Sequence, residues 1–541
     1  SLTNTTDASI AGQLPGLNIN PLGSYKTAML YLSYLDVDKN VDLDNANDDY
    51  NKLEISNSSI ENNSTITGTQ VGQVAMAQEN IYNNPVDVNW VTLTNNGTIN
   101  LSGANSAAMY AKFGVINNTA NIAVGDLSTG IYGIDNSRIG NTGTITIGSG
   151  STGLYYDDAR NGTVTIENLI NNGTITSAGN NSVAMSYNHI GLNVTTFENT
   201  GTINFTGDQN TGMFATGNPG YNTKNSGTIT MGNSASLNNP NVALYTDDVT
   251  NTTKLTNTGT IATGDNTIGI YGNQAENSGN ITVGDGAIAI YSQQGNVDLN
   301  GGTIKLGGNE AVGVYTVGSS QIVTNNGTNF DIAGTSYGFV NVGSGNTINS
   351  IVPNITLGND VVYIYSNDTA GVVTNSTNLL ANGGENYGIY SAGTVTNTGN
   401  INFGTGTRNV GIYSIKGGTA TNNSATITVG ASNPGGNSYS IGMAAGYGTV
   451  DTGNVINNGT INVNGDYGIG MYASGDLGSG NKSTATNNGN IVLNGNNTIG
   501  IYADNGAEAI NSGSITTGSG NYTNVVGVYL GKGSKLTNTS T

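Results

Sequence analysis

A five-residue signature, Asn-x-Gly-Thr-Ile, recurs along this chain of 541 residues. Residues 95–99, 141–145 and 457–461 are complete examples, and further copies and variants of the signature occur along the chain. Counted by its third position, it opens 18 units between residues 64 and 513, at a mean spacing of about 26 residues. A repeat of this period is typical of solenoids, in which each unit packs only against its neighbours.

A second signature, a small residue followed by an apolar and an aromatic residue, falls inside each unit from residue 97 onward. Examples are Gly130-Ile131-Tyr132 and Gly527-Val528-Tyr529. Two interleaved signatures of this regularity do not arise by chance. They indicate that every unit repeats the same local structure.

Each unit reads as three short β-strands. In the first strand, residues 143–147, Ile145 and Ile147 alternate with threonines, and the third strand carries an apolar residue two positions before the signature Asn, such as Leu93. Alternation with a period of two indicates strands with one buried face. Helical periodicity is absent from the repeats. The pattern predicts an all-β fold, a right-handed parallel β-helix with three strands per coil and about 18 units, over residues 64–541.

The second strand of the coil places aromatic residues at regular positions. If Ile268 and Ile270 point inward, Gly269 and Tyr271 are expected to point outward. Thirteen tyrosines share the position of Tyr271 and should form an outward column: 110, 132, 155, 245, 271, 291, 315, 365, 390, 413, 472, 502 and 529. Stacked rings stabilise a β-stack by themselves, and the same column could serve as a platform for a glycan or a protein.

The first Asn of the signature is present in every unit except the one that has Ile351 in its place. Asn tolerates turn conformations and can hydrogen-bond its own backbone. In a stack of coils its amide can also donate to the same amide one coil away. We therefore expect a ladder of asparagines with a structural role, and the signature places Asn300 and Asn423 in it.

Residues 1–63 lack the repeat and carry nine acidic residues against three lysines. Because a solenoid needs a terminal unit to cover its open sheet edges, this segment is interpreted as an N-terminal cap, with a short helix expected near residues 28–34. The run 36–44 begins like a calcium loop. It has Val41 where such a loop needs Gly and Asn47 where it needs a bidentate Glu, so a solvated acidic cap is favoured over a calcium site.

The amino-acid composition argues against several classes of protein and of binding site. Hydrophobic residues make up 35% of the chain at regular positions, which argues against disorder. The chain has no cysteine and a formal net charge of −20, and its 14 basic residues form no visible patch. No disulfide, thiolate metal site or nucleic-acid partner is therefore expected. No apolar run long enough for a transmembrane helix is present.

Residues able to carry catalysis are few and scattered. The single histidine is His189, and the three arginines, at 138, 160 and 408, stand in separate units. The acidic pairs Asp157-Asp158 and Asp247-Asp248 follow tyrosines at matching offsets but are expected three coils apart. Glycosidases need two carboxyl groups close together. We therefore predict a protein that is not an enzyme and has no catalytic, cofactor or metal site.

Binding surface is expected where coils carry insertions, because loops on a rigid scaffold often carry function. The widest spacings between units place extra residues near 432–440, 234–241, 475–481 and 156–161. From these loops and the acidic pairs we select seven candidate ligand-binding residues: Tyr156, Asp157, Asp158, Asp247, Asp248, Asn433 and Tyr439.

The recurring Asn-Asn-Gly-Thr-Ile-Thr and Gly-Ile-Tyr units, over roughly residues 64–541, resemble the passengers of fusobacterial type V autotransporters, the RadD-like group of large outer-membrane adhesins. The resemblance implies secretion through a C-terminal β-barrel, which is not visible in this sequence, and a β-helix displayed on the cell surface. It also implies adhesion to other bacteria or host cells. No catalytic motif is carried over from the family.

These observations predict a non-enzymatic cell-surface adhesin, with surface proteins or glycans of partner bacteria or host cells as partners, no cofactor, and a monomeric state. The alternative is a β-helix enzyme that degrades polysaccharide, either a lyase or a tailspike-like hydrolase. Residues 536–541 align with the start of a further unit. We therefore expect the natural protein to continue beyond residue 541 and the last coil of this chain to fray.

Overall fold

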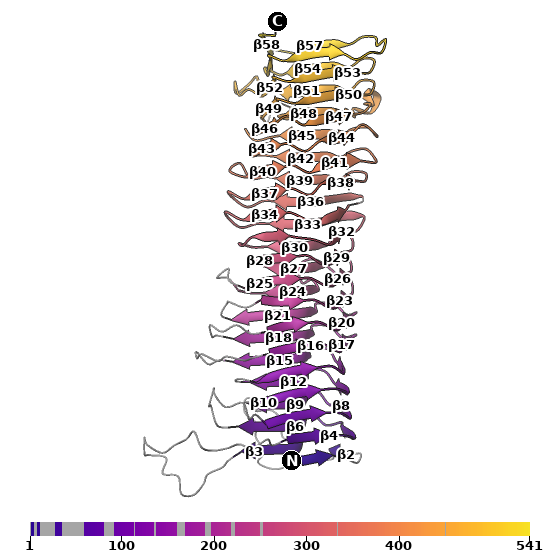
Figure 1. The fold of residues 1–541 in the computed structure, drawn as a ribbon, viewed down its shortest axis with the longest axis vertical. Coiled ribbons are helices and arrows are strands. Elements are labelled where there is room, and N and C mark those ends of the chain that lie inside the picture. The colour runs from indigo at the N-terminus through magenta and orange to yellow at the C-terminus, as the bar shows by residue number, and fades with distance from the viewer. Residues whose placement is uncertain are drawn as a thin grey trace, which may run out of the picture. The chain divides into compact units, whose positions relative to one another are not determined.

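The computed structural model describes residues 2–4, 8–10, 27–34, 59–80, 91–112, 114–134, 137–158, 168–189, 196–217, 222–248, 253–332, 334–448 and 451–540. These residues divide into two compact units, unit 1 (Ser1–Gly264 and Ile270–Asn273) and unit 2 (Asp265–Gly269 and Gln274–Thr541). Within each unit, three columns of parallel strands are built from one strand per coil, so successive coils stack strand on strand, and in unit 2 one of these columns is divided into two sheets (Figure 1). The all-β, parallel β-solenoid fold predicted from the repeat is confirmed.

Three names are used for the sheets of each unit. The asparagine sheet holds the strands that end at the signature Asn, the threonine sheet holds the Thr-Ile-Thr strands, and the tyrosine sheet holds the strands with the aromatic signature.

The asparagine sheet of unit 1 consists of β1 (Leu2–Asn4), β4 (Ser59–Asn62), β7 (Val91–Asn95), β10 (Gly114–Asn118), β13 (Arg138–Asn141), β16 (Asn168–Asn171), β19 (Thr196–Asn199), β22 (Asn222–Asn225) and β25 (Lys254–Asn257). Its threonine sheet consists of β2 (Ala8–Ile10), β5 (Thr65–Gly68), β8 (Thr98–Leu101), β11 (Asn121–Val124), β14 (Thr144–Ile147), β17 (Thr174–Ser177), β20 (Thr202–Phe205), β23 (Thr228–Met231) and β26 (Thr260–Thr263). Its tyrosine sheet consists of β3 (Thr27–Tyr34), β6 (Gln73–Asn80), β9 (Ala107–Lys112), β12 (Thr129–Ile134), β15 (Thr152–Asp158), β18 (Val183–His189), β21 (Thr211–Gly217) and β24 (Val242–Thr246). The next strand, β27 (Ile268–Gly272), has residues in both units.

The asparagine sheet of unit 2 consists of β28 (Gln274–Asn277), β31 (Val297–Leu299), β34 (Ile322–Asn325), β37 (Thr347–Ser350), β40 (Val372–Asn375), β43 (Thr394–Asn397), β46 (Thr419–Asn422), β49 (Asn454–Asn457), β52 (Thr484–Asn487), β55 (Glu508–Asn511) and β58 (Lys535–Asn538). Its threonine strands are β29 (Asn280–Thr282), β32 (Thr303–Lys305), β35 (Asn329–Asp331), β38 (Asn354–Leu357), β41 (Asn378–Ala381), β44 (Ile401–Phe403), β47 (Thr426–Val429), β50 (Thr460–Val463), β53 (Asn490–Leu493) and β56 (Ser514–Thr517). Its tyrosine sheet consists of β30 (Ile288–Ser292), β33 (Asn309–Thr316), β36 (Thr335–Asn341), β39 (Val362–Ser366), β42 (Tyr387–Ser391), β45 (Val410–Ser414), β48 (Ile441–Ala445), β51 (Ile469–Ser474), β54 (Ile499–Asp504) and β57 (Val526–Leu530). One short 3₁₀ helix, η2 (Pro434–Gly436), lies between β47 and β48.

The core of each coil is filled by the inward residues that period-two alternation predicts. Ile145 and Ile147 of β14 are buried, and Ile145 pairs in register with Ile175 of β17. The equivalents of Leu93 in the asparagine sheets are also buried from Ile60 to Ala509, whereas Leu536 in the last strand exposes 41% of its surface. Inward residues thus stack on one another from coil to coil, and the apolar ones remove their surface from water.

The tyrosine strands depart from simple alternation. In β15, Gly153 and Leu154 both point inward, because a Cβ on Gly153 would lie 2.8 Å from Cγ2 of the core residue Ile175 and Leu154 is fully buried. The predicted outward direction of Gly269 is wrong for the same reason, since its Cβ would meet Ile281. Because two consecutive residues point inward, the preceding Thr152 and the following Tyr155 lie on the same outer face.

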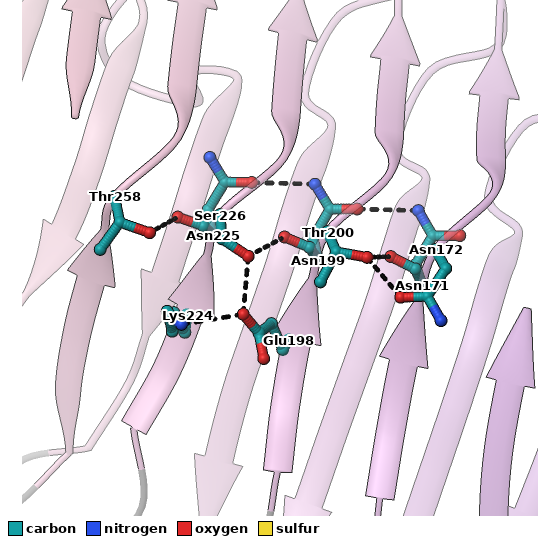
Figure 2. Close-up of polar contacts among 9 residues, drawn as sticks. All are labelled: Asn171, Asn172, Glu198, Asn199, Thr200, Lys224, Asn225, Ser226 and Thr258. Carbon is teal, nitrogen blue, oxygen red and sulfur yellow. Dashed lines mark hydrogen bonds and ion pairs between the residues drawn. The ribbon is translucent and has the colours of Figure 1, made fainter.

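The predicted asparagine ladder is present in unit 1. The side-chain amide of each ladder residue donates to the amide oxygen one coil away, at 2.7 to 2.9 Å from Asn62 through to Asn257. Figure 2 shows Asn171, Asn199 and Asn225 of this series. Asn199 also donates to the carbonyl of Gly201, two residues on, at 3.3 Å. These buried amides thereby satisfy hydrogen-bonding groups that would be costly to leave unpaired.

In unit 2 the ladder is continuous from Asn375 to Asn538 at 2.8 to 3.0 Å. For two coils, the sequence assigned the ladder position to the residue one place after the correct one. The register places Leu299 where Asn300 was expected, and Asn422 where Asn423 was expected. Ser350 occupies the rung between Asn325 and Asn375, where the signature had indicated Ile351.

The N-terminal segment is described only in part. Thr27–Tyr34 is strand β3 and pairs in parallel with β6, so the helix expected near residues 28–34 is wrong. The acidic run 36–44 and most of the predicted cap, 1–63, lie outside the described residues. Among the described residues, no helix has the length and apolar character needed to cross a bilayer.

Candidate functional site

The outer face of the tyrosine sheet in unit 1 carries an aromatic column. Register pairs Tyr110 with Tyr132, and Tyr132 with Tyr155. Beyond them, the same position is occupied by Ser186 and then Phe214. The column continues at Tyr245 of β24. The predicted column is therefore present, but Tyr110 and Tyr132 at its start are buried. It also contains one phenylalanine and one serine that the tyrosine pattern did not include.

The rings of this column contact one another in two groups. Tyr132 and Tyr155 stack with ring centroids 4.9 Å apart and planes inclined by 25°, and Tyr110 meets Tyr132 edge-on at 5.6 Å. On the other side of Ser186, Phe214 and Tyr245 stack at 5.0 Å and 11°. The rings support one another as stacked aromatic rings do, but the column is interrupted at the serine.

A polar column runs beside the aromatic one, two residues further along each strand. Asp157 pairs in register with Asn188, and Asn188 with Thr216. The Asn188 amide donates to Oδ1 of Asp157 at 2.9 Å, and the Thr216 hydroxyl donates to Oδ2 of Asp247 at 2.9 Å. The two carboxylates thus lie three coils apart, as the sequence predicted.

Burial and nearby carboxylates raise the pKa of the tyrosines on this face. For Tyr155 the main cause is burial, and the charge of Asp157 adds to the rise in pKa. Burial and the Asp247 carboxylate likewise raise the pKa of Tyr245. A hydrogen bond with the Asn188 side chain opposes the rise in the Tyr155 pKa but does not outweigh it. Both phenols stay protonated at neutral pH.

Four of the seven predicted ligand-binding residues belong to or follow strands of this face. Asp157 is partly buried and Asp247 is exposed, so both carboxylates reach the outer surface. Asp248 is buried and accepts a hydrogen bond from the backbone N–H of Thr253 at 2.8 Å, so it closes the turn after β24. Asp158 is the last residue of β15, and its side chain lies outside the described residues.

The placement of Tyr156 in an inserted loop is wrong. Tyr156 belongs to β15 and is fully buried, because it follows the outward Tyr155 in an alternating strand. Its ring stacks on Tyr187 at 5.0 Å, and Tyr187 stacks on Phe197 at 5.6 Å. These three rings form an internal stack that fills the core.

The remaining two predicted residues, Asn433 and Tyr439, lie in the loop 432–440 between β47 and β48, and both are exposed. Backbone hydrogen bonds between Asn433 and Ser438 close this loop around η2. The backbone N–H of Ser440 donates to Oγ of Ser432 at 2.8 Å, which fixes the base of the loop. The insertion predicted here is confirmed as a structured loop.

Two other predicted insertions are also loops. The segment 234–241 joins β23 to β24, and the Asn241 N–H donates to Oγ of Ser234 at 2.6 Å. The segment 475–481 joins β51 to β52 and is closed by Asp476, whose N–H donates to the carbonyl of Asn481 at 2.8 Å. Of the fourth, 156–161, residues 159–161 lie outside the described residues.

The tyrosine sheet of unit 2 presents two adjacent rows of aromatic residues. Tyr387 and Tyr390 lie on the same outer face, with centroids 5.8 Å apart, because Gly388 and Ile389 between them both point inward. Tyr390 meets Tyr413 edge-on at 4.9 Å. Burial, reinforced by the neighbouring tyrosines, raises the pKa of Tyr390 to about 12.

A loop after β48 lies close to these rows. The Tyr413 hydroxyl donates to the carbonyl of Gly446 at 3.0 Å. The next residue, Tyr447, exposes 67% of its surface, and its N–H donates to the carbonyl of Asp451 at 3.2 Å. Sequence reasoning did not select Tyr387 or Tyr447, because neither falls at the aromatic position of the repeat.

The charged groups of the described surface are mostly paired or dispersed. Figure 2 shows Glu198, which accepts a hydrogen bond from the Ser226 hydroxyl at 2.6 Å and forms an ion pair with Lys224 at 3.0 Å. Partial burial of Glu198 opposes ionisation, but the bonds from Ser226 and Lys224 outweigh it and lower the carboxyl pKa. In unit 2, Arg408 pairs with Glu385 at 3.5 Å. Within the described ranges, no three His, Cys, Asp or Glu residues form a group that could hold a metal ion.

Comparison with known proteins gives one family match. Residues 272–477 match the model of the BigA third pectate lyase-like domain. The match covers less than half of the chain, and its name agrees with the parallel β-solenoid described above. Neither a curated protein nor a solved structure matches the chain.

Proposed function

We propose that this chain is part of the passenger of a bacterial autotransporter adhesin, displayed at the cell surface. The observation that supports this most directly is the match of residues 272–477 to a domain of BigA, an autotransporter-like bacterial adhesin. The recurring Asn-Asn-Gly-Thr-Ile-Thr and Gly-Ile-Tyr units favour a relationship to the fusobacterial RadD-like group. The partners proposed are surface proteins or glycans of other bacteria or of host cells.

The construction of the coils suits such a role. Each unit is held together by parallel backbone pairing and by hydrogen bonds between buried asparagine side chains. This framework presents the inserted loops 234–241, 432–440 and 475–481, which carry exposed residues. Loops and side chains presented by a rigid scaffold are where binding function usually lies.

A binding assay on cells tests this proposal. Beads coated with the full chain are expected to attach to at least one of a panel of partner bacteria and host cell lines, above beads coated with heat-unfolded chain. Removal of the loop 432–440 through a short Gly-Ser connection, compared with the same replacement of loop 234–241, would show which unit binds. Beads that attach to no cell type better than the unfolded control would contradict the adhesin proposal.

The alternative is a β-helix enzyme that cleaves polysaccharide. Asp157 and Asp247 are separated by three coils, which is about 14 Å at a rise of about 4.8 Å per coil. Glycosidases hold their two carboxyl groups within about 5 to 9.5 Å, so this pair does not have the spacing for that chemistry. New reducing ends, or unsaturated products absorbing in the ultraviolet, released from acidic or neutral polysaccharides by the chain would favour the enzyme instead.

A further inference from the structure

Asn-Gly pairs recur along this chain. Eleven occur, with the asparagine at residues 96, 161, 172, 300, 326, 382, 458, 464, 488, 494 and 505. Asparagine is a chemically labile residue. It is most labile before glycine, because glycine has no Cβ to hinder the attack of its backbone nitrogen on the asparagine side chain. This attack requires that the side-chain amide and the N–H of the following glycine both leave their hydrogen bonds, so the hydrogen bonds of each pair decide where the chain reacts.

Some of these pairs are held through both groups. The side-chain amide of Asn488 donates to Oδ1 of Asn458 in the neighbouring coil at 2.9 Å. The N–H of Gly489 donates to the carbonyl of Asn457 at 3.0 Å. Although Asn488 is exposed, both groups that would react are therefore fixed by hydrogen bonds.

Other pairs in the described ranges are held through one of the two groups. In the pair Asn326-Gly327, the N–H of Gly327 donates to the carbonyl of Leu299 at 3.0 Å. In the next coil toward the N-terminus, the side-chain amide of Asn300 donates to Oε1 of Glu276 at 3.1 Å. One hydrogen bond must open before either of these pairs can react.

The pair Asn382-Gly383 is different. Residue 161 lies outside the described residues, which leaves ten of the eleven pairs, and in nine of these ten at least one group is held. Among the described residues, no hydrogen bond is made by the side-chain amide of Asn382 or by the N–H of Gly383. Asn382 is exposed and directly follows β41, and its own N–H donates to the carbonyl of Leu357 at 3.0 Å. Hydrogen bonding thus fixes the chain up to the N–H of Asn382 but holds neither of the groups that react.

We propose that Asn382 is a site of spontaneous deamidation. Hydroxide from the solvent removes the proton of the Gly383 N–H, and the nitrogen attacks Cγ of Asn382 within the same turn. An N–Cγ bond forms, the Cγ–Nδ2 bond breaks, and ammonia leaves with a proton from water. Water then opens the resulting succinimide ring at one of its two carbonyls, which yields aspartate or isoaspartate at residue 382. This deamidation does not depend on the adhesin function proposed above.

Formation of isoaspartate would change the turn after β41. The Gly383 carbonyl accepts hydrogen bonds from the buried side chains of Asn386 at 3.2 Å and Asn409 at 3.1 Å. Isoaspartate adds one methylene group to the backbone between residues 382 and 383, which displaces this carbonyl while β41 stays paired. Because Asn386 and Asn409 directly precede β42 and β45, these two strands should lose hydrogen-exchange protection as isoaspartate accumulates.

Peptide mass spectrometry on the full chain, incubated in mildly alkaline buffer, tests the proposal. The deamidation rates at Asn382, Asn326 and Asn488 are each divided by the rate of the same residue in urea-unfolded chain, which removes the effect of local sequence. Each hydrogen bond that must open first should slow the reaction by about two- to tenfold. After this correction, Asn382 should react about fivefold faster than Asn326 and about tenfold or more faster than Asn488.

Two variants are the matched controls. Asn458→Ala removes the acceptor of the Asn488 amide at an exposed position, so the reaction at Asn488 should become about two- to tenfold faster. Asn382→Gln removes the reactive residue, so β42 and β45 should keep the protection that the wild-type chain loses. A corrected rate at Asn382 no higher than that at Asn488, or an unchanged rate at Asn488 in the Asn458→Ala chain, would overturn the proposal. An equal loss of protection in the Asn382→Gln chain would overturn the proposed effect on the turn.

Discussion

The hydroxyl of Tyr363 lies 2.7 Å from Oγ of Ser350, at the rung of unit 2 where the asparagine ladder is interrupted. Ser350 also lies 2.7 Å from Oγ1 of Thr377. Tyr363 occupies the register position that belongs to Gly338 and Gly388 in the adjacent coils, and its side chain is fully buried in the core. A tyrosine hydroxyl thus supplies the polar contact that an asparagine amide makes in other coils.

This arrangement makes the stability of unit 2 sensitive to alkaline pH. Burial raises the pKa of Tyr363 to about 12, above the value near 10 of an exposed tyrosine. The folded state therefore keeps the phenol proton between pH 10 and 12, where the unfolded state loses it. We expect the stabilisation to be intact below pH 10 and to fall by about 2 kcal/mol by pH 12.

Tyr363→Phe isolates this effect. The variant should lose about 1 kcal/mol at pH 7 because Ser350 loses a partner, and its stability should depend less on pH between 10 and 12. Urea unfolding at pH 8, 10 and 11.5 measures both quantities. Tyr502→Phe, on the partly exposed outer column, is the matched control. An identical loss between pH 10 and 11.5 in wild type and Tyr363→Phe would show that Tyr363 does not carry the effect.

A second prediction concerns the ladder itself. Asn199 accepts from Asn171 and donates to Asn225, each at 2.8 Å (Figure 2). Asn199→Ala would leave a buried donor and a buried acceptor without partners, so we expect a loss of about 1 to 3 kcal/mol per unpaired group. The control is Asn172→Ala, because Asn172 is exposed and should cost well under 1 kcal/mol.

Hydrogen exchange of the backbone amides shows which strands lose stability in the Asn199→Ala variant. Because solenoid coils are stabilised by their nearest neighbours, Asn199→Ala should reduce protection most in β16, β19 and β22. Protection that falls equally in both variants would mean that the buried ladder is no more important than its exposed neighbours.

Much of the fold could be predicted because its physical causes are local in the sequence. Period-two alternation identified Ile145 and Ile147 as inward residues, and the recurring asparagine identified the ladder, since both depend only on repeated backbone geometry. The ladder was misplaced at Leu299 and Asn422, because the turns after these strands differ in length from the signature. The strand pairing between coils in the structure identifies which residue occupies the ladder position in these two coils.

The candidate site was harder to predict, because it depends on which residues stack across coils. Tyr156 was selected with Asp157 as part of a loop, but alternation within β15 buries the first and exposes the second. Ser186 and Phe214 were missed because the search followed tyrosine alone. The small-apolar pairs before them, Ala184-Met185 and Gly212-Met213, mark the same signature and could have revealed both.

A third prediction tests the inward direction of Gly153 in the tyrosine strand β15. A Cβ on Gly153 would lie 2.6 Å from the carbonyl oxygen of Ala184 and 2.8 Å from Cγ2 of Ile175. Gly153→Val should therefore force the strand out of place and cost about 1 to 3 kcal/mol or more. Ala184→Gly, the converse change one coil away, should cost no more than about 1 kcal/mol. Thermal unfolding followed by circular dichroism compares the two, and equal melting temperatures would contradict the inward direction of Gly153.

The last prediction compares two adjacent residues of β14 that face opposite ways. Ile145 is fully buried between the isoleucines of neighbouring coils, whereas Thr146 is exposed. Ile145→Asp places an unpaired carboxylate in a narrow apolar core, which costs several kcal/mol, and the coil should lose its cooperative unfolding. Thr146→Asp adds the same charge to the same strand on the solvent side, where a change of about 0.5 kcal/mol or less is expected. Circular dichroism during heating measures the whole chain, and hydrogen exchange in β11, β14 and β17 locates the damage. Because each variant gains one aspartate and one negative charge, a similar loss of protection in both would mean that charge in this strand, rather than burial at residue 145, determines the stability of these coils.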